Sequence, residues 1–136
     1  GYGPNFENRN SLTPNSGVRI MGLIALGKLV SKDRNDWMLK LLNRKIPADS
    51  KEADFQSRAF TGGVLPAGTQ LWSKAGYTDT ARLDIAWFKL ANGHEYIFSI
   101  FTKGQSSEPK LIPLVARELL SELGEKVFEG NVEFTE

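Results

Sequence analysis

The chain has 136 residues, the length of one domain, with a hydrophobic fraction of 40% and a charged fraction of 24%. Its 17 basic and 16 acidic residues give a net charge of +1, which argues against a nucleic-acid or polybasic membrane partner. The absence of cysteine and the single histidine, His94, exclude disulfides, thiolate sites and histidine clusters, so we expect neither a metal nor a cofactor. No apolar run approaches the ~20 residues that span a bilayer.

The N-terminal third predicts a loop followed by two helices. The chain begins Gly1-Tyr2-Gly3 without an initiator methionine or a signal peptide, so we interpret it as a trimmed or excised chain. Residues 1–15 are rich in Gly, Asn and Pro, which favours a loop. Apolar residues at three- and four-residue steps predict two helices over residues 16–46. The first has apolar residues around most of its circumference, so we expect it to be buried on most sides. Ser31 or Asp33 is expected to cap the second.

The middle of the chain predicts an antiparallel meander. Asn92-Gly93 is typical of a two-residue hairpin turn, because both central positions of that turn need positive φ. Apolar runs and alternation around it predict three strands at residues 69–77, 82–90 and 94–102.

The C-terminal third predicts one more helix, at residues 107–124, with Ser106 or Ser107 as its cap and Gly124 just beyond its end. Residues 125–136 follow as an acidic tail. The order of elements predicts a single α+β domain over residues 1–136, with an antiparallel sheet packed by helices. Three helices are expected to cover one face of this sheet well but not both.

Lys74 interrupts the first predicted strand, and Ala75 and Gly76 follow it. One interpretation is an edge strand whose lysine faces solvent and discourages pairing between chains. The other is a strand lining a cleft, where Lys74 binds an anionic substrate group and favours a nearby proton transfer. In that case Gly76 lets a ligand approach the backbone, and the N–H of Tyr77 points outward as an oxyanion donor. The residues alone leave both interpretations open.

The sequence "LWSKAGYTDTARLDIAWFKLANGHEYIFSIFTKG" resembles the third to fifth strands of the serine β-lactamase and penicillin-binding protein fold. That family carries Lys-Thr-Gly on the first of these strands, and Lys74-Ala75-Gly76 is the counterpart, with alanine in place of threonine. Residues 8–42 resemble the end of the omega loop and the two helices after it in class A β-lactamases. Residues 107–124 resemble the C-terminal helix. The resemblance implies a β-lactamase-like domain that lacks its N-terminal elements.

The same resemblance implies the site residues. Lys74 corresponds to a catalytic lysine, and Ala75, Gly76 and Tyr77 lie where the family binds its substrate. Arg82, at the start of the next strand, is implied to reach across and hold the substrate carboxylate with a bidentate fork. An exposed arginine at the end of a strand is the alternative.

Two further polar residues lie in or beside the predicted strands. Asp84 has apolar neighbours, and if it is buried it needs a cationic partner, which Lys74 or Arg82 would supply. A solvent-facing Asp84 fits the sequence equally well. His94 follows the hairpin, so we expect it to face solvent.

Two parts of the family's catalytic machinery are absent from the chain. The family's nucleophile motif Ser-x-x-Lys and its Ser-Asp-Asn loop lie upstream of the matching region. Residues 107–110 fit Ser-x-x-Lys by letters only, and a helix cap explains Ser107 better. Glu7 is the only acid in residues 1–15, and the pattern around the family's deacylating glutamate is missing, so we interpret Glu7 as a solvated loop carboxylate.

Three functions are compatible with these observations. The first is a serine β-lactamase-like hydrolase acting on a β-lactam or a peptidoglycan peptide, of which this chain alone is inactive because it lacks the nucleophile. The second is a non-catalytic relative used for binding or as a scaffold, and the third is a small α+β interaction domain.

The resemblance implies that the parent protein is periplasmic or secreted. Open strand edges also predict a homodimer or strand swap through residues 125–136, which a monodisperse monomer in sedimentation would contradict.

Overall fold

The computed structural model describes residues 3–5, 11–46 and 55–128 and has the α+β architecture that the sequence predicts. The three long strands agree with the predicted ranges to within one residue at each end. Glu7, part of the omega-loop-like segment and most of the acidic tail lie outside the described residues. The elements are α1 (Pro14–Ala25), α2 (Lys32–Leu42), β1 (Asn43–Arg44), α3 (Phe55–Arg58), the 3₁₀ helix η2 (Thr61–Val64), β2 (Gln70–Tyr77), β3 (Ala81–Lys89), β4 (Glu95–Lys103) and α4 (Leu111–Glu122).

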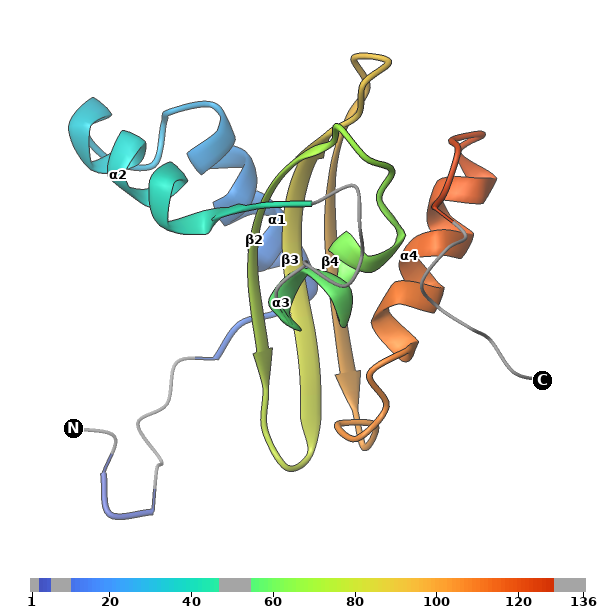
Figure 1. The fold of residues 1–136 in the computed structure, drawn as a ribbon. Helices are drawn as coiled ribbons and strands as arrows, with labels where there is room; N and C mark the ends of the chain where they lie inside the picture. Colours follow the sequence, from blue (N-terminus) through green and yellow to red (C-terminus); the bar gives the residue numbers. More distant parts are fainter. Residues whose placement is uncertain (1–2, 6–10, 47–54, 129–136) are drawn as a thin grey trace.

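The sheet has the order β1-β2-β3-β4, and every neighbouring pair is antiparallel. Helix α4 packs on one face of the sheet, whereas α1 packs against β3 and β4 on the other, with α2 beside β2 (Figure 1). Both faces therefore carry helices, and the face under α1 and α2 is only partly covered. The two faces hold two separate apolar clusters.

The main core lies between the sheet and α4. Phe88 is fully buried at its centre, with the ring of Phe98 edge-on at 5.1 Å and the ring of Tyr96 at 5.7 Å. Ile112 and Leu120 project from α4 into the same cluster, and both are fully buried. Ring pairs of this geometry add to the free energy of burial, and this cluster holds more buried residues than the one on the other face.

On the other face, a glycine brings α1 close to the sheet. A β-carbon at Gly17 would lie 2.8 Å from both Ile85 Cδ1 and Ser99 Oγ, so only glycine allows this approach without a shift. Met21 is buried one turn further along the same helix. Trp72 and Trp87 stack with ring centroids 4.3 Å apart and extend this second cluster.

The outer side of α1 stays exposed, which corrects the prediction that this helix is buried on most sides. Ile20, Leu23 and Leu26 are 40%, 39% and 68% exposed, while Met21 and Ile24 on the sheet side are buried. One sheet face can bury only one stripe of a helix, and no other described element covers the opposite stripe of α1.

The ends of the helices differ from the predicted ends. Helix α1 begins two residues before Ser16, where Thr13 accepts a hydrogen bond from the Ser16 N–H at 3.2 Å and Pro14 occupies the first turn. Helix α4 begins at Leu111 without a side-chain cap, so the prediction that Ser106 or Ser107 caps it is wrong. Instead, the hydroxyl of Ser106 donates to the carbonyl of Asp79 at 2.6 Å and ties this turn to the β2–β3 hairpin.

The β3–β4 hairpin has a three-residue loop in place of the predicted two-residue turn. The N–H of Leu90 donates to the carbonyl of His94 at 2.9 Å, and the N–H of Gly93 donates to the carbonyl of Leu90 at 3.0 Å. Gly93 has a φ of 91°, as the third position of such a loop requires. The Asn-Gly signal therefore marked the hairpin correctly but not the length of its loop.

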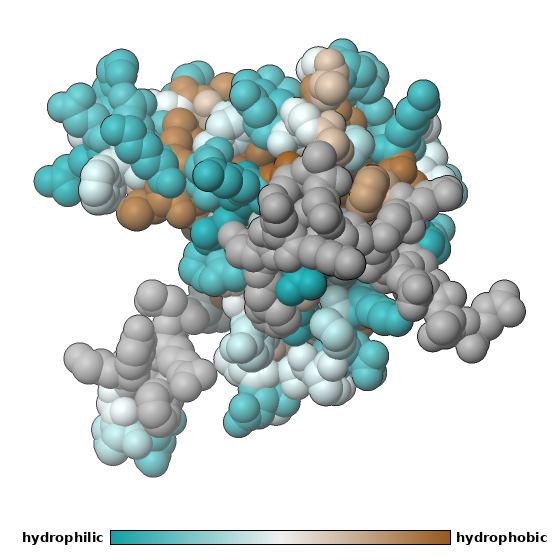
Figure 2. Space-filling view, viewed as in Figure 1, coloured by the Kyte–Doolittle hydropathy of each residue, from teal (hydrophilic) through white to brown (hydrophobic). Residues whose placement is uncertain are grey.

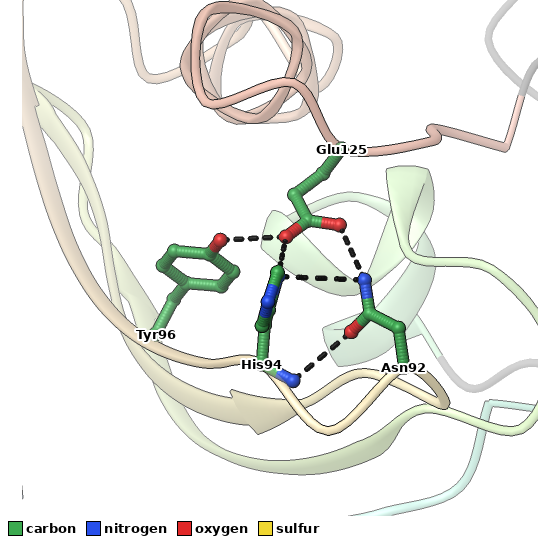
Figure 3. Close-up of polar contacts among 4 residues, drawn as sticks. All are labelled: Asn92, His94, Tyr96 and Glu125. Atoms are coloured by element: carbon green, nitrogen blue, oxygen red, sulfur yellow. Dashed lines mark hydrogen bonds and ion pairs between the residues drawn. The ribbon is translucent and has the colours of Figure 1, made fainter.

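A carboxylate after α4 fastens that helix to the hairpin. Glu125 accepts hydrogen bonds from Tyr96 Oη at 2.6 Å and from Asn92 Nδ2 at 2.8 Å, and it contacts Nδ1 of His94 (Figure 3). The side chain of Glu125 is only 6% exposed, while that of His94 is 64% exposed, in line with its predicted exposure. Hydrogen bonds, first from Tyr96 and then from His94, lower the pKa of Glu125.

This cluster predicts a specific pH dependence of stability. The pKa of Glu125 is lower in the folded state than in the unfolded state. The ionised carboxylate therefore stabilises the fold above its unfolded pKa of about 4.3, and this stabilisation is lost as the pH falls through its folded pKa. We therefore expect Glu125→Gln to lower stability at pH 7 and to lose less stability than the wild type between pH 5 and pH 3. Urea unfolding at several pH values measures this, with the exposed Glu122→Gln as the control; parallel curves for wild type and Glu125→Gln would contradict it.

Candidate functional site

The outer edge of β2 is the part of the sheet where the sequence placed its candidate site. Strand β1 pairs only with Leu71 and Trp72, and beyond Trp72 no strand of the described residues pairs with the outer edge of β2, the edge away from β3. The segment from Lys74 to Tyr77 therefore presents a sheet edge on one side and β3 on the other. Such an edge offers backbone N–H and C=O groups to anything that lies along it.

The register shows which backbone groups face that edge. The N–H of Thr78 donates to the carbonyl of Ala81 at 2.8 Å, so these two residues form a hydrogen-bonded pair. Hydrogen-bonded and non-hydrogen-bonded pairs alternate along an antiparallel ladder. Tyr77, opposite Arg82, is therefore a non-hydrogen-bonded position, and its N–H and C=O point away from β3. The same holds for Ala75.

Lys74 lies on the α1 and α2 side of β2, as an exposed residue in the middle of the strand. Its Nζ donates to the outward carbonyl of Ala75, which keeps the ammonium group over the sheet edge. The side chain also lines a pocket of about 520 Å³ between β2 and the two helices. Lys74 is thus both an edge-strand lysine and a residue that lines a cavity.

Gly76 is on the same face of β2 as Lys74. A β-carbon at this position would lie 3.5 Å from Leu83 Cδ1 and 3.7 Å from Leu83 Cγ, both ordinary van der Waals distances, and no other side chain of the described residues comes within 4 Å. Packing among the described residues therefore does not require glycine here, and its small size lets a ligand approach the backbone.

Ala75 and Arg82 point to the opposite face of the sheet from Lys74. Ala75 is 4% exposed and belongs to the main core. Arg82 is 3% exposed, its Nη2 donates to the carbonyl of Ala59 at 3.0 Å, and its guanidinium lies 4.3 Å from the ring centre of Phe60. Burial lowers the pKa of Arg82. The structure thus holds Arg82 within the fold and does not bring it to Lys74.

Asp84 is buried, but its partners are not the predicted ones. Its Oδ2 accepts a hydrogen bond from the backbone N–H of Thr61 at 3.0 Å. Burial raises the pKa of Asp84, and hydrogen bonds from Thr61 together with the charge of Arg44 partly oppose that shift. The cation whose charge lowers this pKa is Arg44, which the sequence analysis did not name. Arg44 belongs to the two-residue strand β1, which has no detectable sequence signal.

The described residues show no nucleophile motif at a helix start, no metal-ligand cluster and no membrane-spanning helix. Ser107 lies in an exposed turn before α4 and does not open a helix. Within residues 3–5, 11–46 and 55–128, no three His, Cys, Asp or Glu side chains come together as metal ligands. In the same part of the chain, no helix has the length and apolar composition needed to cross a membrane.

Comparison with solved structures shows the same fold at low sequence identity. A mutant of PBP-A, solved as an acyl-enzyme complex with penicillin G, has a TM-score of 0.70 and 18% identity over 91% of this chain and 44% of its own. The chromosome-encoded β-lactamase of Vibrio parahaemolyticus has a TM-score of 0.67 and 18% identity over 91% and 48%. A β-lactamase from Sphaerobacter thermophilus has a TM-score of 0.64 and 19% identity over 85% and 44%.

This chain therefore spans less than half the length of each of these structures. No curated protein matches it by sequence. Residues 3–129, however, match the sequence profile described as the beta-lactamase enzyme family. Since that match covers nearly the whole chain and the fold agrees with it, the chain belongs to the β-lactamase enzyme family.

Proposed function

We propose that this chain carries the substrate-binding strand of a serine β-lactamase-like hydrolase, whose substrates are β-lactams or peptidoglycan peptides. The observation that carries the proposal is the position of Lys74 on the outer edge of β2, near a backbone N–H of Tyr77 that faces the same edge. A cation beside an outward N–H matches a substrate that carries both a carboxylate and a reactive carbonyl.

In the proposed reaction, a serine oxygen attacks the substrate carbonyl, the carbonyl oxygen gains negative charge, and the C–N bond breaks as the nitrogen takes a proton. Lys74 holds the substrate carboxylate and favours the nearby proton transfer, while the N–H of Tyr77 donates to the developing oxyanion. The acyl-enzyme of PBP-A with penicillin G supports a covalent step of this kind. The serine would come from residues outside this chain, because its only Ser-x-x-Lys, residues 107–110, lies in an exposed turn.

One residue favours a second candidate, a non-catalytic β-lactamase-like domain for binding or scaffolding. Ala75 lacks the hydroxyl of the family motif, and its methyl group is buried in the main core. Losing one hydrogen bond to a substrate costs about 0.5–1.5 kcal/mol, which weakens binding without abolishing catalysis. Under either function we propose a periplasmic or secreted location for the parent protein, in keeping with the family resemblance. A homodimer or strand swap through residues 125–136 stays a prediction.

Labelling by a fluorescent penicillin tests the proposed function. In the full-length protein that contains this chain, we expect covalent labelling that survives denaturing electrophoresis. Lys74→Ala should slow it roughly ten- to hundredfold, the worth of one charged hydrogen bond. Lys103→Ala, at the exposed end of β4, is the matched control and should label at the wild-type rate. Reversible binding without labelling would favour the non-catalytic candidate. Equal labelling rates for all variants would show that Lys74 does not act on the substrate.

A further inference from the structure

We propose that Asn92 is a site of spontaneous covalent modification, where deamidation of its side chain produces a carboxylate that loosens the end of α4 from the β3–β4 hairpin. Asn92-Gly93 is the only Asn-Gly pair of the chain. Both residues are exposed at the tip of the hairpin, which lies among hydrophilic surface at the top of Figure 2. The inference rests on the cluster around Glu125 and does not depend on the proposed hydrolase activity.

The reaction needs only this pair of residues and water. The backbone nitrogen of Gly93 attacks Cγ of Asn92, the new N–Cγ bond closes a cyclic imide, and the Cγ–Nδ2 bond breaks. Nδ2 leaves as ammonia and takes up the proton of the Gly93 nitrogen. Water then adds to either imide carbonyl, which gives aspartate or isoaspartate at this position. Because glycine has no β-carbon, its nitrogen reaches Cγ with little hindrance.

In the folded hairpin, each of the three reacting groups is held by a hydrogen bond. The N–H of Gly93 donates to the carbonyl of Leu90 at 3.0 Å. Oδ1 of Asn92 accepts from the backbone N–H of His94 at 3.0 Å, and Nδ2 of Asn92 donates to Oε2 of Glu125 at 2.8 Å (Figure 3). Ring closure must break these contacts, so the reaction proceeds from a locally open hairpin and the closed cluster slows it.

Deamidation turns the attractive contact with Glu125 into a repulsive one. Nδ2 of Asn92 is a hydrogen-bond donor, whereas the carboxylate oxygen that replaces it is a negatively charged acceptor. It would face Oε2 of Glu125, whose side chain is only 6% exposed, and two carboxylates this close repel each other. The N–H of Glu125 also donates to the carbonyl of the buried Leu120 at 2.9 Å, so the repulsion acts on the end of α4.

Mass spectrometry of the folded 136-residue chain tests the modification. During incubation at mildly alkaline pH, we expect Asn92 to exchange its amide NH₂ for OH, with isoaspartate among the products. The isolated peptide of residues 90–96 should react at least about tenfold faster, because it lacks the cluster that holds the reacting groups. An unmodified Asn92 in the folded chain after the peptide has reacted completely, or equal rates for the two, would overturn the proposal.

A variant of Glu125 tests whether the cluster controls the rate. Glu125→Ala should speed deamidation of the folded chain about fivefold, the factor expected for one partly exposed hydrogen bond to a charged group. Glu122→Ala, at an exposed position of α4, is the matched control and should react at the wild-type rate. A rate in Glu125→Ala that equals or falls below that of the wild type would refute the protective role of this carboxylate.

Thermal unfolding of substituted chains tests the consequence. Asn92→Asp should lower Tm by at least about 3 °C more than Asn92→Ala, which removes the donor without adding a charge. Combining Asn92→Asp with Glu125→Gln exchanges the amide and the carboxylate, so we expect it to recover most of that difference. If Asn92→Asp were as stable as Asn92→Ala, or if Glu125→Gln recovered nothing, the modified residue would not act through Glu125 and the proposal would fail.

Discussion

Replacing Phe88 with alanine is expected to lower the free energy of unfolding by about 3–5 kcal/mol, the usual range for a buried phenylalanine. Phe88 is 0% exposed, and it contacts the rings of both Phe98 and Tyr96. Its removal takes away apolar burial and two ring contacts, and it leaves a cavity between the sheet and α4 that close-packed neighbours fill only in part.

Urea unfolding followed by circular dichroism measures this loss. Because a loss of this size approaches the whole stability of a small domain, Phe88→Leu provides a graded second variant with an expected loss of about 1–1.5 kcal/mol. Leu26→Ala is the matched control, since Leu26 is 68% exposed and should change stability by less than about 0.5 kcal/mol. If Phe88→Ala behaved like Leu26→Ala, the core would not lie between β3 and α4.

The strands could be predicted because local sequence and tertiary packing agree there. Apolar runs on both sides of Asn92-Gly93 favour a pair of antiparallel strands, and β3 and β4 form such a pair. Strand β3 is buried on both faces, whereas β4 is mostly half-buried. The hairpin loop differs only because Gly93 takes the left-handed position of a three-residue loop. A glycine with φ of 91° fits either loop, so the sequence could not decide its length.

The surroundings of the helices could not be predicted in the same way. Ile20 and Leu23 belong to an apolar pattern that indicates burial, yet they face outward in the described structure. Periodicity shows that a face is apolar, but it does not show which element covers it. For a chain that spans less than half of its structural neighbours, the covering element need not be part of the sequence at hand.

The candidate site depended on register, which the sequence left undetermined. Lys74 and Arg82 lie near each other in sequence and suggest a joint carboxylate site. The hairpin, however, pairs Arg82 with Tyr77, and side chains alternate between faces, so Arg82 and Lys74 are on opposite faces. A shift of the β2–β3 register by one residue would have put both side chains on the same face of the sheet. The contact of Glu125 with His94, 31 residues apart, likewise has no local signal.

Gly63 and Gly76 are expected to respond differently to substitution by alanine, because only Gly63 is crowded by backbone atoms. A β-carbon at Gly63 in η2 would overlap the carbonyl oxygen of Arg58 and lie 3.2 Å from its carbonyl carbon. Backbone atoms cannot move aside as a side chain can, so Gly63→Ala is expected to lower stability by about 3 kcal/mol, the upper part of the range for overpacking. At Gly76 the same methyl group would meet, among the described residues, only the Leu83 side chain, with Cδ1 at 3.5 Å and Cγ at 3.7 Å, and Gly76→Ala should change stability by less than about 1 kcal/mol.

Thermal and urea unfolding of the two variants measure this contrast, with each glycine serving as the control for the other. If Gly76 keeps the edge of β2 accessible to a substrate, Gly76→Ala in the full-length protein should slow labelling by a fluorescent penicillin several-fold while its stability stays near that of the wild type. A Gly76→Ala variant that is strongly destabilised would assign this glycine to folding. One that is stable and labels normally would place the substrate elsewhere than over the backbone of β2, because a methyl group there has no other described neighbour to disturb.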